Sequence, residues 1–486
     1  MHSYKGKKIL VNFILELSKL CLSTCEVSKT EKYASLLLHD KHIKKNKSLL
    51  ENIYLNLGEA YYIHGKYKDA LNYFLMVWDT HKNEDINKVE LAMNIGKVYL
   101  RSGKFSYSKV FLTQSLEILN KIPAQQSLNQ IHRLINVCLG NLYVEMGNYP
   151  LANKHLQSAV TLTNGEDEKS QLTLAIAYKH LGICSMKLGQ YSKAISELQT
   201  SCNIYQKIYC GEIYTEFGSL YVNLAISNEK LREYDKAIYY LNYALTKYGV
   251  HFGEDNHPEI GSIYLNLGVI NREHKNYEIA LEQFKKSLNI YLKFYGEVNP
   301  RSGIVYLNLG IYYREQFDFI LAEKYIKKAI KIYANLYEKD THSNMGRAYR
   351  ELGLCYLQQG NSSKALNCLD HSLEIYQSED VYGNVKHPNI ATTYFNLGET
   401  YFSLQDYHQA IAYFQKSIDM YKTCYGTENV RLKIAFVHKS LGLCFLNVGE
   451  YSQAAIHLQN ALEIGLLLND SEFVYAVKEL QKKYDL

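Results

Sequence analysis

Asparagine is the residue type whose placement in this sequence points most directly to chemistry. Six asparagines stand two residues before a small residue, in segments such as "YLNLG" at 54–58 and "YFNLG" at 394–398. The six are Asn56, Asn94, Asn223, Asn266, Asn308 and Asn396. A carboxamide offers a hydrogen-bond donor and an acceptor, so it can pair with both backbone groups of an extended peptide without selecting its side chains. The six carboxamides are therefore candidates for hydrogen bonds to backbone groups, either of a ligand or of a neighbouring helix.

The other residue types that could carry chemistry are scattered. The 17 histidines include no HExxH or similar metal-binding spacing, and His257 and His387 belong to linkers. The ten cysteines form no CxxC pair, so neither a zinc site nor a disulfide framework is indicated. Serine, histidine and acidic residues recur too evenly for one catalytic centre, and no glycine-rich phosphate loop occurs. We therefore expect no catalytic residue, no metal and no cofactor.

Length and charge favour an elongated protein that does not bind nucleic acid. A chain of 486 residues is too long for one ordinary core, and 47% apolar content is ample for a folded chain. Residues 1–50 hold ten lysines and four acidic residues, a balance of +6, which leaves −1 of the total +5 for the rest. A surface that binds nucleic acid would need a broader basic face. Most of the 45 tyrosines are better explained as residues of the protein core than as residues that stack on nucleic-acid bases.

The sequence gives no sign of a membrane span. No apolar run approaches the roughly 18 uncharged residues that a membrane helix requires. The segment "KGKKILVNFILELSKLCLSTC" at 5–25 resembles a secretory signal in its first residues, but its apolar residues fall at helical spacing. An amphipathic helix is the preferred interpretation, and a lipoprotein cleavage site ending at Cys25 is the weaker alternative. We expect a cytoplasmic protein.

A repeated element of about 43 residues positions the asparagines. Each copy has a small anchor residue. Six of the ten copies have a glycine seven residues later, nine have an aromatic residue nine later, and nine have an alanine twelve later. The ten anchors are Gly58, Gly96, Gly140, Gly182, Ala225, Gly268, Gly310, Gly353, Gly398 and Gly442. Apolar periodicity predicts two helices per copy, and the anchor and alanine let these helices approach closely. One such hairpin cannot bury both of its faces, so the copies must stack.

The repeat resembles the tetratricopeptide repeat over roughly residues 49–468. Its linkers, such as "GEDNHPEI" and "YGEVNPRS", with Pro258 and Pro300 at the start of a first helix, are similar to those of kinesin light chains. The heptad coiled coil of a light chain is missing, so we do not expect a motor subunit. The resemblance implies an all-α, right-handed superhelical solenoid of about ten helix-turn-helix repeats with terminal capping helices. We expect a basic N-terminal helical cap at 1–48, ten repeats at 49–468 and a C-terminal capping helix at 469–486.

The resemblance also implies a binding site. In such proteins the first helices line a concave groove, and the asparagine position contacts the ligand backbone. Lys230, Arg272 and Arg314 lie beside an aliphatic strip in the middle repeats, so they join the six asparagines in the predicted peptide-binding site. The alternative is that each asparagine forms hydrogen bonds with a neighbouring helix or with water, and that a terminus of the chain fills the groove. Four repeats replace the asparagine, by Cys138, His180, Glu351 and Ser440.

These features predict a non-catalytic scaffold or adaptor that binds an extended peptide segment of a protein partner in the concave groove. The alternative is a peptide-sensing regulator whose superhelix changes conformation when a ligand binds, although we identify no output module. An enzyme would require chemistry that the residues do not show. The identity of the partner and the oligomeric state stay open at this point.

Overall fold

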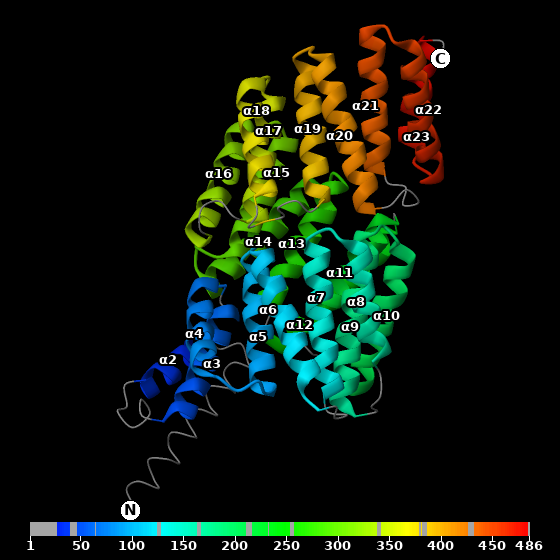
Figure 1. The fold of residues 1–486 in the computed structure, drawn as a ribbon. Helices are drawn as coiled ribbons and strands as arrows, with labels where there is room; N and C mark the ends of the chain where they lie inside the picture. Colours follow the sequence, from blue (N-terminus) through cyan, green and yellow to red (C-terminus); the bar gives the residue numbers. More distant parts are fainter. Residues whose placement is uncertain are drawn as a thin grey trace, which may run out of the picture. The chain divides into compact units, whose positions relative to one another are not determined.

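The computed structural model describes most of the chain, in two compact units, Met1–Leu139 and Gly140–Leu486. Within them it describes residues 27–38, 46–63, 65–123, 128–162, 167–209, 216–231, 233–252, 257–337, 342–378, 381, 386–425 and 432–484. All regular secondary structure in these ranges is helical (Figure 1).

The helices follow one another with short connections. They are α2 (Val27–Leu38), α3 (Lys47–Ile63), α4 (Tyr67–Thr80), α5 (Ile86–Arg101), α6 (Phe105–Lys121), α7 (Leu128–Glu145), α8 (Tyr149–Thr161), α9 (Glu168–Lys187), α10 (Tyr191–Ile208), α11 (Glu216–Lys230), α12 (Tyr234–Phe252), α13 (Pro258–Glu273), α14 (Tyr277–Tyr295), α15 (Pro300–Glu315), α16 (Phe319–Leu336), α17 (Ser343–Gln358), α18 (Ser362–Gln377), α19 (Pro388–Ser403), α20 (Tyr407–Tyr425), α21 (Leu432–Val448), α22 (Tyr451–Leu467) and α23 (Ser471–Tyr484).

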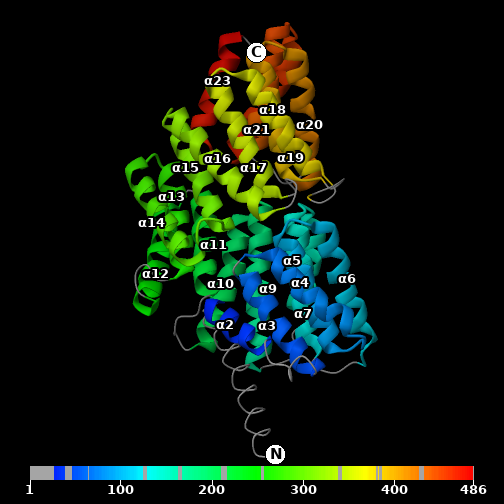
Figure 2. The ribbon, with the colours of Figure 1, turned by 90° about the vertical axis from the view of Figure 1, so that its left-hand side faces the viewer.

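Consecutive helices pack in pairs, and the pairs stack. In the second unit the pairs run from α9–α10 to α21–α22, and each pair also contacts the next (Figures 1 and 2). The first helices of these pairs, α9, α11, α13, α15, α17, α19 and α21, contact one another in succession. We call these seven helices the inner layer, because in a curved stack the helices on the concave side lie closest together. The predicted all-α solenoid of paired helices is confirmed.

The anchor glycines let the two helices of a pair meet. A Cβ atom on Gly268 would lie 2.6 Å from Cε1 of Phe284, a side chain that is fully buried. On Gly442 it would lie 2.7 Å from Cγ of Leu458. The alanine of the second helix, Ala280 in this repeat, is also fully buried. The small residues are thus required by close helix contact, as the repeat pattern predicts.

In five repeats a second contact joins the second helix to the start of the first. Ser287 Oγ donates to the Gly261 carbonyl at 2.7 Å, and the ring of Tyr291 packs where a Cβ on Gly261 would lie. Other serines make the same bond to a carbonyl 26 residues earlier: Ser115, Ser201, Ser372 and Ser417. The sequence analysis missed this bond, which supplies a partner for a hydroxyl that is completely buried.

Histidine and asparagine linker residues cap the first helices. His257 Nδ1 accepts from the backbone N–H of Glu259 at 3.2 Å, and Asn299 Oδ1 accepts from that of Arg301 at 2.8 Å. Proline follows each cap at the first helical position, where its missing N–H needs no partner. His257 therefore has a structural role.

In most repeats a glycine at positive φ lies in the turn between the first and the second helix. In the repeat of α15 and α16 the residue at this position is Phe317, with φ 59. The side chain of Phe317 is 75% exposed, so little packing offsets the strain of this backbone conformation. We expect Phe317→Gly to raise the free energy of unfolding by about 1 kcal/mol, as measured by urea denaturation. Phe317→Ala, which keeps a Cβ, is the control and is expected to bring no gain. Equal stability of the two variants would contradict the strain argument.

Each unit carries one further helix. Ala34 and Leu37 of α2 pack against Ile53 and Leu57 of α3 in the first unit. In the second unit Asp470 Oδ1 accepts from the Phe473 backbone N–H at 3.1 Å and begins α23. Of the predicted N-terminal cap at 1–48, residues 1–26 and 39–45 lie outside the described residues.

Candidate functional site

Four of the six predicted asparagines lie on the inner layer of the second unit. Asn223 is on α11, Asn266 on α13, Asn308 on α15 and Asn396 on α19. The other two lie in the first unit, Asn56 on α3 and Asn94 on α5. Asn56, Asn308 and Asn396 are buried, with 4–6% of their surface exposed, and the others are partly exposed.

Three carboxamides use one N–H within their own helix. Nδ2 donates to the carbonyl four residues earlier: Asn223 to Ser219 at 2.7 Å, Asn266 to Ser262 at 2.8 Å and Asn308 to Ile304 at 2.9 Å. The described residues give no partner to the Oδ1 atoms of these three side chains. The alternative structural role therefore accounts for one hydrogen bond of each carboxamide and leaves an acceptor for a ligand.

Asn396 and Asn94 behave differently. Nδ2 of Asn396 is buried and has no acceptor among the described residues. Asn94 Oδ1 receives a long bond of 3.4 Å from Lys97 Nζ in the first unit. The repeated asparagine is thus not used in one uniform way.

Charged side chains form a ladder across four neighbouring helices of the inner layer, α11, α13, α15 and α17. We call these eight residues the charge ladder: Glu229, Lys230, Arg272, Glu273, Arg314, Glu315, Arg350 and Glu351. The nitrogen–oxygen distances are Lys230–Glu229 3.0 Å, Lys230–Glu273 3.5 Å, Arg272–Glu273 3.7 Å, Arg272–Glu315 3.5 Å, Arg314–Glu351 3.5 Å and Arg350–Glu351 3.5 Å. Lys230 and Arg272 thereby belong to one group of ion pairs and Arg314 to a second, and the charge of Arg314 also acts on Glu315 of the first group.

The guanidinium groups in this ladder are not fully hydrogen-bonded. Nε and Nη1 of Arg272 and Nε of Arg314 are buried, and none of them makes a hydrogen bond in the described part of the chain, although Nε of Arg272 lies 3.5 Å from Oε2 of Glu315. The two side chains are only 10% and 13% exposed. Buried donors without acceptors are costly, so these atoms favour a ligand that brings carbonyl or carboxylate oxygens.

The predicted site contained three of these eight residues and did not include Glu229, Glu273, Glu315, Arg350 and Glu351. Arg350 and Glu351 lie on α17, where Glu351 takes the position that asparagine holds in other repeats. A buried acid at that position, directly after an arginine, is the signal that could have indicated the network. The pairing of Glu351 with Arg314 of the preceding repeat depends on helix rotation, which the spacing alone does not give.

Two acids meet at the start of the ladder. Burial, and then a hydrogen bond shared with Glu273, raise the pKa of Glu229 to about 7, while the nearby Lys230 opposes the shift. The side chain of Glu229 is 12% exposed. One proton shared by the two carboxyl groups relieves their repulsion.

This pKa predicts a pH dependence of stability. The folded pKa of Glu229 lies above its ordinary value of 4.5, so the folded state binds more protons than the unfolded state between 4.5 and about 7. Stability is expected to fall by about 1 to 3 kcal/mol as pH rises through this window. The measurement is the difference in urea denaturation free energy between the protein and Glu229→Gln at each pH. A difference that does not change with pH would refute the shared proton.

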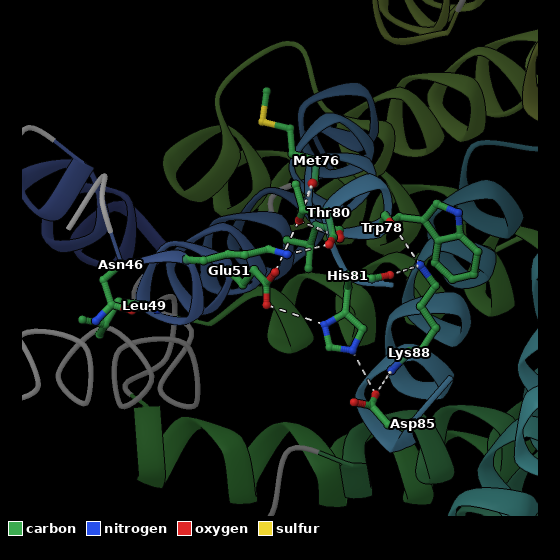
Figure 3. A network of polar contacts seen from close by, with 11 residues as sticks. Asn46, Leu49, Glu51, Met76, Trp78, Thr80, His81, Asp85 and Lys88 are labelled. Atoms are coloured by element: carbon green, nitrogen blue, oxygen red, sulfur yellow. Dashed lines mark hydrogen bonds and ion pairs between the residues drawn. The ribbon is translucent and has the colours of Figure 1, made fainter. Parts of the chain in front are cut away.

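A second polar network, in the first unit, is structural. Lys88 Nζ donates to the carbonyls of Trp78 and His81, both at 2.7 Å, and lies 3.6 Å from the Trp78 ring centroid (Figure 3). Burial lowers the pKa of Lys88. His81 in turn bonds Asp85, which caps α5 (Figure 3). Lys88 donates to carbonyl groups at the end of α4, where the helix itself supplies no donor. The network therefore has a structural role and needs no ligand.

In the described ranges no group of three or more His, Cys, Asp or Glu residues could hold a metal ion. Among the described helices none has the length and apolar character to cross a membrane.

The comparisons with known proteins identify the repeat. A family model described as tetratricopeptide repeat matches residues 132–207, 216–293, 294–378, 380–423 and 389–466. A second model of the same description matches 52–83. No match was found among curated proteins. The predicted similarity to kinesin light chains is not confirmed by these models.

The solved structures that this chain resembles have low sequence identity to it. A Rap protein complexed with Competence and Sporulation Factor is 14% identical, with a TM-score of 0.52 over 79% of this chain and 99% of that chain. Yeast Tom70 is 14% identical, with a TM-score of 0.47 over 98% and 97%. The apo form of the quorum sensor NprR from B. thuringiensis is 14% identical, with a TM-score of 0.45 over 78% and 97%. Only the first of these scores exceeds 0.5, and it supports the solenoid fold.

Proposed function

The chain belongs to the tetratricopeptide repeat family, and from that premise we propose that it is a non-catalytic protein-interaction scaffold whose inner layer binds an extended peptide. The observation that carries the proposal is the incomplete hydrogen bonding of the inner layer, where Nη1 of Arg272 and Nε of Arg314 have no hydrogen-bond acceptor among the described residues, although both guanidinium groups form ion pairs. The proposed partner is a protein or peptide in the cytoplasm, and nucleic acid has no part in it.

The spacing of the carboxamides suits an extended ligand. Neighbouring helices lie roughly 10 Å apart, and an extended peptide advances roughly 3.3 Å per residue. Asn266 on α13 and Asn308 on α15 would therefore meet about every third ligand residue. Each contact is worth about 0.5–1.5 kcal/mol, so apolar burial must supply the remaining affinity.

The experiment is a screen of the full chain against a random-peptide library, followed by titration of the peptides that bind. Asn266→Ala with Asn308→Ala is expected to weaken a selected peptide by about 5-fold to 100-fold, because two backbone contacts are lost. Asn289→Ala, at an exposed position on α14, is the matched control and should leave the affinity unchanged. Unaltered binding by the double variant would remove the asparagines from the proposed site.

One contact within the second unit favours the alternative of a peptide-sensing regulator. The rings of Tyr149 and Tyr425 are stacked at 5.7 Å, and His387 lies against Gly147, where an added Cβ would be 2.9 Å from its Cδ2. These segments are far apart in sequence, so a change in superhelical pitch would separate them. The Rap structure, solved with a bound factor, fits this alternative.

Solution scattering separates the two functions. A scaffold should bind the selected peptide with little change in radius of gyration, whereas a sensor should change its radius and disrupt the contact of Tyr149 with Tyr425. A cysteine pair for spin labels at exposed positions near these two tyrosines would report that separation directly. An unchanged distance with bound peptide would exclude the sensor mechanism.

A further inference from the structure

The repeat of α15 and α16 differs from the other nine at two surface positions. Phe317, in the turn before α16, is 75% exposed, and Ile320, in the first turn of α16, is 83% exposed. The other nine repeats have glycine or a polar residue at the position of Phe317, and proline or a polar residue at that of Ile320. The fold therefore requires neither apolar side chain.

The backbone at Phe317 is strained for a side chain that packs little. Its φ of 59 lies in the left-handed region, and its ring meets only the edge of the Phe319 ring, with 6.2 Å between centroids, among the ring contacts of the described residues. A strained residue that does not contribute to the core points to a function outside the core.

Three lysines continue the exposed face of α16. With Ile320 they occupy positions i, i+4, i+7 and i+11, which lie within about 60° of one another around the helix axis. They are Lys324, Lys327 and Lys331, and all three are exposed. At 1.5 Å per residue the stripe is roughly 16 Å long. We call Phe317, Ile320 and these three lysines the α16 stripe.

The charge of α16 is larger than that of the equivalent helices. Four lysines and one glutamate give it 4 − 1, or +3. None of the other second helices from α8 to α22 exceeds +1, with histidine counted as neutral. The α16 stripe is thus a local concentration of positive charge on a unit that is otherwise close to balanced.

Acidic neighbours neutralise only part of this charge. Lys327 pairs with Glu323 at 2.6 Å, yet its side chain is still 57% exposed. Among the described residues no acid lies within ion-pair distance of Lys324 or Lys331, and Glu297 acts on Lys331 only from farther away. Two ammonium groups are therefore left to attract an external anion.

The shape of the stripe suits a broad surface. All five side chains come from one helix and the turn before it, so they form a ridge and not a groove walled by two helices (Figure 1). Lysine ammonium groups are point charges, which attract phosphate and carboxylate groups without a fixed hydrogen-bond geometry. A basic helix face with exposed apolar residues is the combination that binds the interface of an anionic bilayer.

We propose that the α16 stripe binds the surface of a membrane that contains anionic lipids. Phe317 and Ile320 enter the headgroup region, and the three lysines contact lipid phosphate and carboxylate groups. The contact uses a second helix and leaves the inner layer open to a peptide. The inference therefore goes beyond the proposed function and would place the scaffold at a membrane surface.

The test is co-sedimentation of the full chain with vesicles of phosphatidylcholine, alone or with about one third phosphatidylserine. We expect at least about 10-fold tighter binding to the anionic vesicles. The difference should shrink at high salt, because salt screens the attraction between the lysines and the headgroups.

The apolar end of the stripe is tested by Phe317→Gly combined with Ile320→Ser. This variant has the residue types that the repeat of α17 and α18 holds at Gly360 and Ser363. It is expected to bind anionic vesicles about 10-fold more weakly, because less apolar surface is buried. Since Phe317→Gly is expected to stabilise the fold, unfolding would not explain the loss.

The basic part is tested by Lys324→Gln combined with Lys331→Gln, which is expected to weaken binding by about 10-fold to 30-fold. Lys416→Gln with Lys422→Gln removes the same charge from exposed positions of α20 and is the matched control. Leu404→Ser, at a side chain that is 49% exposed after α19, is the control for apolar surface. Both controls should bind like the unchanged protein.

Four results would overturn the proposal. The first is equal binding to both kinds of vesicle, or to neither. The second is full binding by the α16 variants, which would assign the attraction to another part of the chain, such as the lysine-rich residues 1–50. The third is an equal loss in the controls. The fourth is α16-dependent binding to polyglutamate without binding to vesicles, which would identify an acidic protein as the partner.

The proposed function is tested separately. Library-selected peptides should bind the α16 variants as tightly as the unchanged protein, because the stripe lies outside the inner layer. If vesicles bind through α16 but no library peptide binds, the membrane contact stands and the peptide scaffold falls.

Discussion

Replacing Gly268 with valine is expected to lower the free energy of unfolding by about 3 kcal/mol and to separate α13 from α14. A Cβ at this position would lie 2.6 Å from Cε1 and 2.7 Å from Cδ1 of Phe284. The Phe284 ring is fully buried, so it cannot move aside without opening the core. Valine adds two further methyl groups to the same space.

The measurement is urea denaturation followed by circular dichroism, with Phe284→Ala as the second member of a double-mutant cycle. Because the deleted ring makes room for the added methyl groups, the double variant should cost less than the sum of the single changes. Lys285→Val, at an exposed position of α14, controls for the helix propensity of valine and is expected to cost under about 1 kcal/mol. Additive costs in the cycle would show that Gly268 is not needed for this contact.

Replacing Glu351 with alanine is expected to cost about 3 to 5 kcal/mol, because it leaves two buried cations without their shared acid. Arg314 and Arg350 are 13% and 11% exposed, and both lie 3.5 Å from Glu351. Burial alone would raise the pKa of Glu351, but the charges of Arg350 and Arg314 outweigh it and hold this pKa below the ordinary value. The stabilisation is therefore present above the ordinary pKa of glutamate and is lost as pH falls through the lower folded value.

Thermal and urea denaturation at neutral pH measure this cost, and the same measurement at decreasing pH should show the gap to Glu351→Ala closing. Glu282→Ala is the matched control, since Glu282 pairs with Lys286 at 2.7 Å on the surface of α14. Exposed pairs of this kind contribute little to stability. A Glu351→Ala cost no larger than that of the control would mean that the charge ladder does not hold the inner layer together.

The repeat could be predicted from the sequence because the small residues that define it are required by steric contact between neighbouring helices. Glycine at Gly268 and alanine at Ala280 report how closely two helices approach, and this constraint recurs in each copy. The same reasoning could have found the serine bond, since Ser287 and its equivalents keep a fixed spacing to the carbonyl that they contact.

The candidate site was only partly predictable because it depends on helix rotation between repeats. The sequence placed Asn266, Arg272 and Arg314 on first helices, but it did not give the pairing of Arg314 with Glu351. The spacing also could not show that one N–H of the Asn266 carboxamide donates to a carbonyl of its own helix. It could not show that Nδ2 of Asn396 has no acceptor among the described residues. Hydrogen-bond satisfaction follows from three-dimensional packing, which the linear pattern does not contain.

The most direct test of the account is a crystal structure of the full chain with a library-selected peptide. We expect an extended peptide along the inner layer, with the carboxamides of Asn266 and Asn308 within hydrogen-bond distance of its main chain. The free donors of Arg272 and Arg314 should face ligand oxygens. A peptide bound instead to the second helices, such as α14 or α16, or an inner layer occupied by the protein's own chain, would contradict the proposed function.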